Sequence, residues 1–323
     1  MKHHSIKSAC AAALLLALAA GTAQAAYPER AITLIVPTAA GGGNDVLARV
    51  VGQKVGELLG QTVIVVNKPG AQGAIASDYV ARQPADGYTL MLGYIGTHGI
   101  NPALQKLNYD PVKDFTPIGM VADSPTIMIV STRIPVHDVA GLVKYSREHP
   151  DSLSFASAGA GTAPAIAGEL FNQATGAQML DVPYRGSAPA LTDTLSGTTQ
   201  VMFPSLFSVY PHLKSGMIQA LAVAGATRSS ALPDLPTLAE AGVPGVDVPQ
   251  WYAIFAPAKA DPAIVATLNK ALNQALADPA VAKKIGEQGA EVRSSTPAEL
   301  GSFVESEAAR WKQLAASRQL AAR

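Results

Sequence analysis

The chain has 323 residues, with 24 basic and 24 acidic side chains, and only 15% of its residues are charged. Because it is neutral overall and has no polybasic run, neither nucleic acid nor an anionic membrane surface is expected as a partner. Its length exceeds what one hydrophobic core usually supports, so two domains are predicted.

Residues 1–25 have the pattern of a secretory signal peptide. Lys2 and Lys7 precede an apolar run, and Ala23-Gln24-Ala25 is an A-x-A cleavage signal. Cleavage removes 25 of the 323 residues and leaves 298, with 22 basic and 24 acidic side chains and a net charge near −2. It also removes the single cysteine, Cys10, so disulfides and thiolate metal sites are excluded from the mature chain. No later stretch is long and apolar enough to span a membrane.

Residues 31–59 predict a strand, a glycine-rich loop and a helix. A short β-branched run ends at Pro37, three consecutive glycines follow, and apolar residues then recur with helical spacing. Asn44 or Asp45 is the natural N-cap of this helix. A loop of this kind directs free backbone N–H groups toward one point at the positive end of a helix dipole. We therefore predict a site for a small anion.

Two more units of this type follow. Residues 63–66 form a second predicted strand before the glycine-bearing turn at 67–73, and residues 88–92 form a third strand before the small-residue loop at 93–98. Strands that alternate with helical or small-residue segments indicate a parallel sheet. In open sheets of this kind, ligands bind beyond the carboxyl ends of the strands, where these glycine loops fall.

A second domain with the same pattern is expected from about residue 123. Its predicted strands are 126–130, 153–157, 179–182 and 201–203, its predicted helices are 138–148, 163–175 and 187–195, and the run 218–224 is expected to lead back. Prolines and glycines are dense in residues 232–250, which suits a return crossover. A strand at 251–255 and helices that begin after Asp261, Asp278 and Thr296 then complete the first domain.

The predicted fold is therefore α/β with two lobes joined by two crossing strands. Lobe 1 is expected to comprise residues 26–122, lobe 2 residues 123–232, and residues 233–323 the crossover and the return to lobe 1. Each lobe is expected to be a mostly parallel sheet flanked by helices. The cleft between the lobes is the predicted ligand site.

Three loops, at 39–45, 158–163 and 184–188, would present helix N-termini to this cleft. One glycine loop alone carries little weight, because strand–helix turns need small residues for geometry alone. Three at equivalent positions favour capture of an anion by backbone amides. A G-x-x-x-x-G-K-[ST] phosphate loop is absent, and the glycines at 159 and 161 lack the third glycine of a dinucleotide fingerprint.

The side chains near these loops give little indication of catalysis. No histidines have metal-ligand spacing and no G-x-S-x-G motif occurs, so neither a metal site nor a serine hydrolase is predicted. Thr97 and His98 end a loop expected to face the cleft, and His98 is a candidate for ligand contact. Tyr184 could stack on a ligand or hydrogen-bond to it, whereas Arg185 could clamp a carboxylate or face solvent. Trp251 could form a cleft wall, although core packing is favoured.

Six motifs extend over nearly the whole mature chain: VPTAAGGGND at 36–45, VNKPGAQG at 66–73, HGINP at 98–102, AGAGT at 158–162, VPYRG at 182–186 and LPDLPTLAEAG at 232–242. Together they resemble the motifs of Bug-type solute-binding proteins, the periplasmic receptors of tripartite tricarboxylate transporters. The resemblance implies a two-lobed periplasmic-binding-protein fold, similar to type II, that closes on its ligand. It also implies a non-catalytic protein of the periplasm that captures a di- or tricarboxylate or an aromatic acid and delivers it to transporter subunits in the membrane.

The resemblance further implies that main-chain N–H groups, small side chains and bridging water hold the carboxylate, from the loops at 38–45, 72–74 and 158–162. We expect no cofactor, a monomer, and no membrane insertion after signal cleavage. Asp45 is expected to cap the helix or hold a water, since two carboxylates repel each other. The predicted ligand-binding residues are Thr38, Ala39, Gly43, Asn44, Asp45, Gln72, Gly73, Ala74, Thr97, His98, Ala158, Gly159, Thr162, Tyr184, Arg185 and Ser205.

The chain departs from the family pattern after Phe203. Members often carry an acidic residue and an amide there, whereas this chain has Pro204-Ser205. The change favours a plain organic or aromatic acid over an amino acid. Two alternatives remain open: a secreted hydrolase, which a nucleophile–base pair in the cleft would support, and a ligand-presenting input to a membrane sensor kinase.

Overall fold

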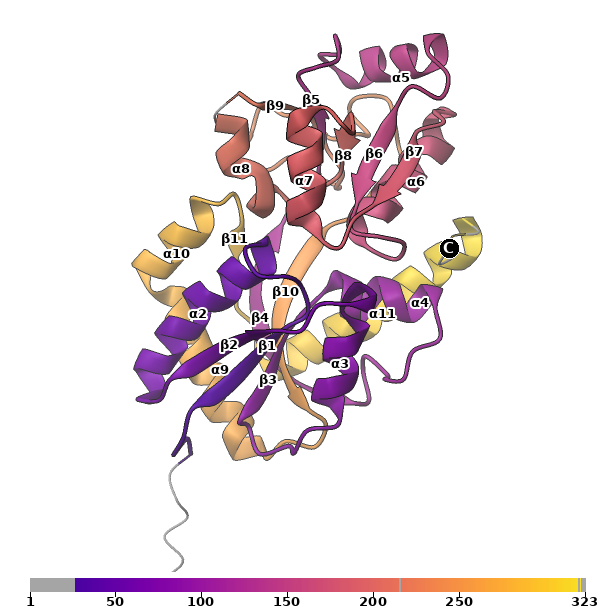
Figure 1. The fold of residues 1–323 in the computed structure, drawn as a ribbon. Helices are drawn as coiled ribbons and strands as arrows, with labels where there is room; N and C mark the ends of the chain where they lie inside the picture. Colours follow the sequence, from indigo (N-terminus) through magenta and orange to yellow (C-terminus); the bar gives the residue numbers. More distant parts are fainter. Residues whose placement is uncertain (1–26, 215, 319, 321–323) are drawn as a thin grey trace, which may run out of the picture.

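The computed structural model describes residues 27–214, 216–318 and 320. The predicted signal peptide and its cleavage site lie outside the described residues. Two β-sheets, one six-stranded and one five-stranded, form the centres of two lobes that are joined by extended crossings (Figure 1). This two-sheet α/β architecture confirms the predicted fold class.

The first sheet has the strand order β11-β4-β10-β3-β1-β2. Its strands are β1 (Ile32–Val36), β2 (Val63–Asn67), β3 (Thr89–Tyr94), β4 (Phe115–Ser124), β10 (Gln250–Pro257) and β11 (Glu291–Val292). β1 is parallel to β2 and β3, but β10 runs antiparallel to β3 and β4, and β11 runs antiparallel to β4. The helices of this lobe are α2 (Gly43–Leu59), α3 (Ala74–Ala81), α4 (Asn101–Leu104), α9 (Pro262–Ala277), α10 (Pro279–Gly286) and α11 (Pro297–Arg318), with the short turns η1 (Ala71–Gly73) and η2 (Gly96–Ile100).

The second sheet has the order β7-β6-β8-β5-β9. Its strands are β5 (Ile127–Ser131), β6 (Ser154–Ser157), β7 (Leu180–Pro183), β8 (Val201–Met202) and β9 (Ile218–Val223), and its helices are α5 (Val139–Glu148), α6 (Ala163–Thr175), α7 (Ser187–Ser196) and α8 (Leu206–Lys214). β6 is parallel to β7 and β8, whereas β5 is antiparallel to β8 and β9. Both sheets are therefore mixed, not mostly parallel. In the first sheet the reason is topological: the chain leaves lobe 1 along β4 and returns along β10, so these two strands point in opposite directions.

The core of the first lobe is centred on β10. All eight of its residues are buried: β3 and β4 pair with its two edges, and α3 and α11 pack against it. Trp251 is 2% exposed and packs edge-to-face against Phe303 of α11, with ring centroids 5.3 Å apart. Trp251 is thus a core residue, as favoured from the sequence.

Two segments connect the lobes, residues 124–126 and the residues that precede β10. Thr126 joins them, because its Oγ1 donates to the carbonyl of Val248 at 2.6 Å and accepts from Gln250 Nε2 at 2.9 Å. Before reaching β10, the segment at 233–249 stays with the second sheet: the N–H of Leu238 donates to Val223 and that of Val248 to Ala224. The return to lobe 1 therefore begins at β10.

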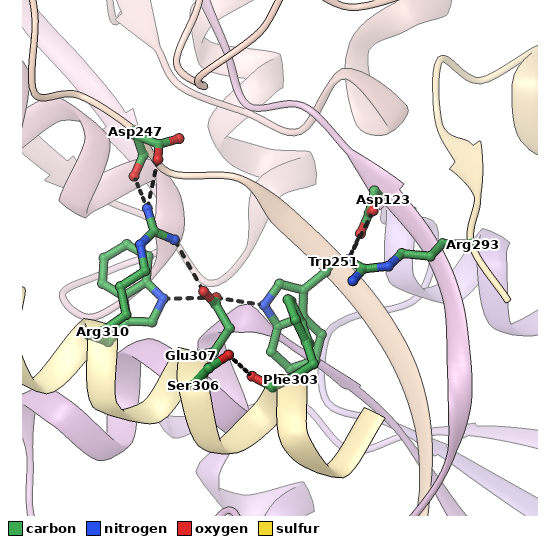
Figure 2. Close-up of polar contacts among 9 residues, drawn as sticks. Asp123, Asp247, Trp251, Arg293, Phe303, Ser306, Glu307 and Arg310 are labelled. Atoms are coloured by element: carbon green, nitrogen blue, oxygen red, sulfur yellow. Dashed lines mark hydrogen bonds and ion pairs between the residues drawn. The ribbon is translucent and has the colours of Figure 1, made fainter. Parts of the chain in front are cut away.

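A polar cluster on α11 fixes the start of β10 (Figure 2). Glu307 accepts from the indole N–H groups of Trp251 at 2.9 Å and of Trp311 at 3.2 Å, and Arg310 Nη1 donates to it at 3.2 Å. Arg310 also donates through Nη2 to the carboxylate of Asp247 at 2.9 Å and to its carbonyl at 3.0 Å. Because Asp247 precedes the crossing, the cluster ties the second lobe's return segment to a helix of the first lobe.

Local sequence signals predicted most helix starts. Asp138, Asp261 and Asp278 cap α5, α9 and α10 through their side chains, and Thr296 forms the expected capping box with Glu299. The expected loop at 93–98 is instead the end of β3 and the helical turn η2. Helix α8 had no predicted counterpart. No helix among the described residues is long and apolar enough to cross a membrane.

Candidate functional site

The loop between β1 and α2 contains two polar atoms that the protein leaves without a partner. Thr38 Oγ1 and Asn44 Nδ2 are buried and make no hydrogen bond. The loop itself is held in place, since Asn67 Nδ2 donates to the carbonyl of Thr38 at 3.1 Å. Buried polar atoms are rarely left unpaired, because each costs about 1–3 kcal/mol of desolvation. These two atoms are therefore suited to contact a ligand that enters the loop.

Asp45 does not cap α2, contrary to the sequence prediction. Gly42 is the N-cap residue, and Asp45 lies in the first turn with 4% of its surface exposed. Its carboxylate accepts from the N–H of Gly41 at 3.0 Å and pairs with Arg49 at 2.9 Å. Burial by itself raises the pKa of Asp45, but the hydrogen bonds from Arg49 and Gly41 outweigh burial and hold the pKa below its usual value. Arg49 thus balances a carboxylate that would otherwise repel an anion in this loop.

The loop between β6 and α6 has a comparable arrangement in the second lobe. Gly159 and Gly161 have φ angles of +100° and +80°, which only glycine adopts readily. Thr162 is the N-cap residue of α6, but its hydroxyl donates to the carbonyl of Gly159 at 2.6 Å and makes no cap hydrogen bond. The first N–H groups of α6 are therefore left without a side-chain acceptor.

The helices that follow the predicted loops start differently from the three helices that aspartates cap. α2, α3, α6 and α7 all begin without a side-chain cap hydrogen bond, whereas aspartates cap α5, α9 and α10. Uncapped N–H groups and the positive end of the helix dipole together attract anions. Helix starts that follow the predicted loops thus keep the donors that an anion requires.

The turn at η1 completes the first-lobe side and is strained. Ala71 and Gln72 both have positive φ angles, 45° and 51°, which cost energy in residues other than glycine. Two side chains hold the turn: Tyr94 Oη donates to the carbonyl of Gln72 at 3.2 Å, and Asn101 Nδ2 donates to it at 2.8 Å. A groove of about 670 Å³ borders the turn and is also lined by Gly159 to Gly161, α6 and β7.

The two lobes touch at these loops. A Cβ added to Gly43 would lie 2.9 Å from a ring atom of Phe207 on α8, and one added to Gly161 would lie 2.6 Å from Asn101 Oδ1. Gln72 Nε2 would lie 3.3 Å from a Cβ on Gly159. The structure therefore brings the loops that contain Gly43, Gln72 and Gly159 to the boundary between the lobes.

Thr97 and His98 lie in the core of the first lobe instead of facing the cleft. Both have 0% exposure, and the His98 ring stacks on Phe255 with centroids 4.0 Å apart. Burial lowers the pKa of His98 to about 3, so the ring is neutral at physiological pH. The sequence prediction that these two side chains face the ligand is corrected, because η2 turns them inward.

Four other predicted residues have partners within their own lobe or face solvent. Tyr184 Oη donates to Asp193 at 2.7 Å, and burial together with this carboxylate raises the pKa of Tyr184 to about 12. Ser205 Oγ donates to Ser208 Oγ at 3.2 Å, and Arg185 is exposed. Gly73 is buried, where an added Cβ would lie 2.7 Å from the methyl group of Thr97.

The remaining predicted residues are accessible or lie at the loop ends. Ala39, Ala74 and Ala158 are each partly exposed. Two residues at the lobe boundary, Asn101 and Phe207, were not among the predicted site residues. Asn101 lies in the HGINP motif, so the sequence offered a signal for it. Phe207 lies on α8, a helix that no sequence pattern indicated.

Among the residues that the structure describes, no group of histidine, aspartate or glutamate side chains is arranged to hold a metal ion.

This chain is similar in sequence and structure to several known proteins. Residues 47–320 match the family described as "Tripartite tricarboxylate transporter family receptor". Protein BugT of Bordetella pertussis is 34% identical over 297 residues, which cover 91% of this chain and 91% of that protein. A structure entitled "R. palustris Rpa4515 with adipate" is 38% identical with a TM-score of 0.87, and it covers 91% of this chain and 99% of that one. "MatC (Rpa3494) from Rhodopseudomonas palustris with bound malate" is 34% identical with a TM-score of 0.84, over 89% of this chain and 99% of that one.

Proposed function

We propose, since this chain belongs to the tripartite tricarboxylate transporter family of receptors, that it binds a small organic carboxylate between its two lobes. The membership confirms the resemblance seen in the sequence motifs. The family is one of solute-binding receptors, and the structures of two relatives hold adipate and malate. A dicarboxylate is therefore the first class of ligand to test.

The observation that supports this proposal most strongly is the set of unused donors at the lobe boundary. Helices α2 and α6 begin there without side-chain caps, and Asn44 Nδ2 is a buried donor without an acceptor. A carboxylate supplies acceptor oxygens and a negative charge, which match both the free N–H groups and the helix dipoles. We assign the carboxylate to the loops at 38–45 and 158–162.

The proposed ligand-binding set is narrower than the set predicted from sequence. Its members lie at the lobe boundary or on the loops that reach it: Thr38, Ala39, Gly43, Asn44, Gln72, Ala74, Ala158, Gly159 and Thr162. Asp45 contributes indirectly, by fixing Gly41 while Arg49 balances its charge.

We further propose that the receptor works in the periplasm as a monomer and closes on its ligand by a population shift. It then delivers the ligand to the membrane subunits of a transporter. The hydrolase alternative would need a nucleophile–base pair open to the cleft. Thr97 Oγ1 and His98 Nδ1 are 2.9 Å apart, but the Thr97 hydroxyl donates to the carbonyl of Tyr94 at 3.0 Å and the His98 ring is stacked on Phe255 in the core of the first lobe.

A thermal-unfolding screen tests carboxylate binding. Mono-, di- and tricarboxylates and aromatic acids are added in turn, with adipate and malate included. A ligand at one hundred times its dissociation constant should raise the free energy of unfolding by about 2.7 kcal/mol. No stabilisation by any acid would contradict the proposal, and turnover of a chromogenic ester in the cleft would favour a hydrolase.

Thr38→Val then tests where the ligand binds. The substitution removes a buried hydroxyl oxygen that has no partner, so the free protein should be as stable as before or more stable. Affinity for the carboxylate should fall roughly tenfold, which corresponds to one lost hydrogen bond. Thr33→Val on β1, a matched change in the strand that leads to the loop, should leave affinity unchanged. Equal affinities for the two variants would place the ligand elsewhere.

A further inference from the structure

Asn101 has an acceptor atom that nothing in the protein satisfies. The residue is 0% exposed, and Oδ1 is buried without a hydrogen-bond partner. Its amide orientation is fixed, because Nδ2 donates to the carbonyl of Gln72 at 2.8 Å and only an N–H group can do so. Oδ1, not Nδ2, is therefore the atom that faces the second lobe.

The unpaired oxygen lies against the second-lobe loop. A Cβ on Gly161 would lie 2.6 Å from Oδ1, and the next nearest atom of another residue would be Leu104 Cδ1, at 3.8 Å. Gly161 belongs to the loop that precedes the uncapped N-terminus of α6. Asn101 Oδ1 thus lies beside the segment to which we assign the carboxylate.

The chemistry of Oδ1 limits what can satisfy it. An amide oxygen only accepts hydrogen bonds, so it would repel a carboxylate oxygen and needs an O–H or N–H donor. The donors of the α6 loop are the ones that a carboxylate would use. A hydroxyl group elsewhere on the ligand would donate the hydrogen bond that Oδ1 lacks. This hydroxyl is uncharged, as is the Asn101 amide that would accept from it.

The neighbouring turn shows that Asn101 is held at a fixed position. Gln72 keeps a strained φ of 51°, and its carbonyl receives hydrogen bonds from both Tyr94 and Asn101. Strained backbone of this kind persists only where surrounding contacts enforce it, and it is commonly found at functional sites. The turn and the Asn101 amide therefore form one preorganised unit, and Oδ1 is held against the Gly161 loop at the boundary between the lobes.

We propose that Asn101 Oδ1 accepts a hydrogen bond from a hydroxyl group of the ligand, so that the receptor prefers a hydroxycarboxylate to the same acid without the hydroxyl. This inference rests on the proposed carboxylate-binding function. It departs from the expectation of a plain acid drawn from Pro204-Ser205, because it adds a hydroxyl group, although the ligand still has no amine.

Titration calorimetry with matched pairs of acids tests the preference. The pairs malate and succinate, 3-hydroxybutyrate and butyrate, and mandelate and phenylacetate each differ by one hydroxyl. For a pair that binds, the hydroxylated acid should bind about tenfold more tightly to the wild-type protein. Asn101→Leu, which keeps the approximate side-chain shape, should reduce this ratio to about one.

Tyr94→Phe is the control for a merely structural role. It removes the other hydrogen bond to the Gln72 carbonyl and leaves Asn101 Oδ1 in place. It should weaken both members of a pair by the same factor and so preserve their ratio. If Asn101→Leu does not fold, Asn101→Ala replaces it with the same expected loss of preference.

Three results would overturn the inference. Equal affinities within every pair that binds the wild-type protein would do so, as would a preference that survives removal of the Asn101 amide, or one that Tyr94→Phe abolishes equally. In each case the protein would still bind carboxylates, so the proposed function would stand. Failure of every acid to bind would instead refute the proposed function and this inference with it.

Discussion

Replacing Glu307 with alanine removes the carboxylate that joins α11 to the start of β10. The Glu307 side chain is 7% exposed and accepts from the indole N–H groups of Trp251 and Trp311 at 2.9 and 3.2 Å, and from Arg310 at 3.2 Å. Each indole N–H left buried without an acceptor costs about 1–3 kcal/mol. With the loss of the ion pair and the space left behind, we expect the free energy of unfolding to fall by about 3–5 kcal/mol.

Equilibrium unfolding in urea, followed by circular dichroism, measures this change. Glu305→Ala on the exposed face of the same helix is the matched control and should stay within about 0.5 kcal/mol of the wild type. Glu307→Gln should be intermediate, because its amide oxygen can still accept from an indole. A loss below about 1 kcal/mol for Glu307→Ala would show that the cluster does not stabilise the crossing.

Three further predictions follow from individual contacts. Burial lowers the pKa of His98 from 6.5 to about 3, so the neutral His98 ring contributes fully to stability above pH 6.5, and this contribution is lost as the pH falls toward 3. In a plot of unfolding free energy against pH, His98→Leu should therefore reduce the slope on the acid side by up to about 1.4 kcal/mol per pH unit. Gly161→Ala and Gly176→Ala both force a Cβ onto a positive φ, and Gly176→Ala should cost about 1 kcal/mol of stability. Gly161→Ala should cost more and should also weaken carboxylate binding in calorimetry, because its Cβ would lie 2.6 Å from Asn101 Oδ1 at the lobe boundary, whereas a Cβ at Gly176 meets no atom within 4 Å. A double-mutant cycle on Arg310 and Asp247 should give a coupling energy below about 1 kcal/mol that shrinks in high salt, since these side chains are 35% and 45% exposed; a larger, salt-insensitive coupling would contradict this assessment.

The sequence predicted those parts of the fold that depend on neighbouring residues. Asp138, Asp261 and Thr296 were read correctly as helix starts, because a cap forms within one turn of chain. The apolar runs of β1 and β10 marked buried strands for the same reason. The motifs between them were sufficient to identify the family.

The predictions that were wrong concern features that depend on more than the local sequence pattern. The antiparallel pairing of β10 with β3 and β4 joins residues far apart in sequence, and no local pattern specifies it. Asp45 was expected as an N-cap, but Arg49 and Gly41 compete for its carboxylate. Helix α8 was missed because Pro211 lies within it, and Phe207 was missed with it.

The sequence indicated the positions of the loops more accurately than the directions of their side chains. The loops at 38–45, 72–74 and 158–162 each reach the lobe boundary, where Gly43 lies against Phe207 and Gln72 lies against Gly159, and glycine patterns mark where the chain turns in each of them. Whether a side chain in such a loop points inward depends on the packing around it. The His98 side chain therefore points into a cluster of aromatic core residues, whereas the Asn101 side chain, in the same motif, points toward Gly161.

Hydrogen–deuterium exchange of the backbone amides tests the central claim most directly, namely that peptide N–H groups of both lobes hold the carboxylate. Exchange is measured by mass spectrometry with and without an acid that stabilises the protein. We predict slower exchange at residues 39–45 and 159–165 together, with α9 as an internal reference that does not change. Protection confined to one lobe, or absent from both loops while the acid is bound, would contradict the account.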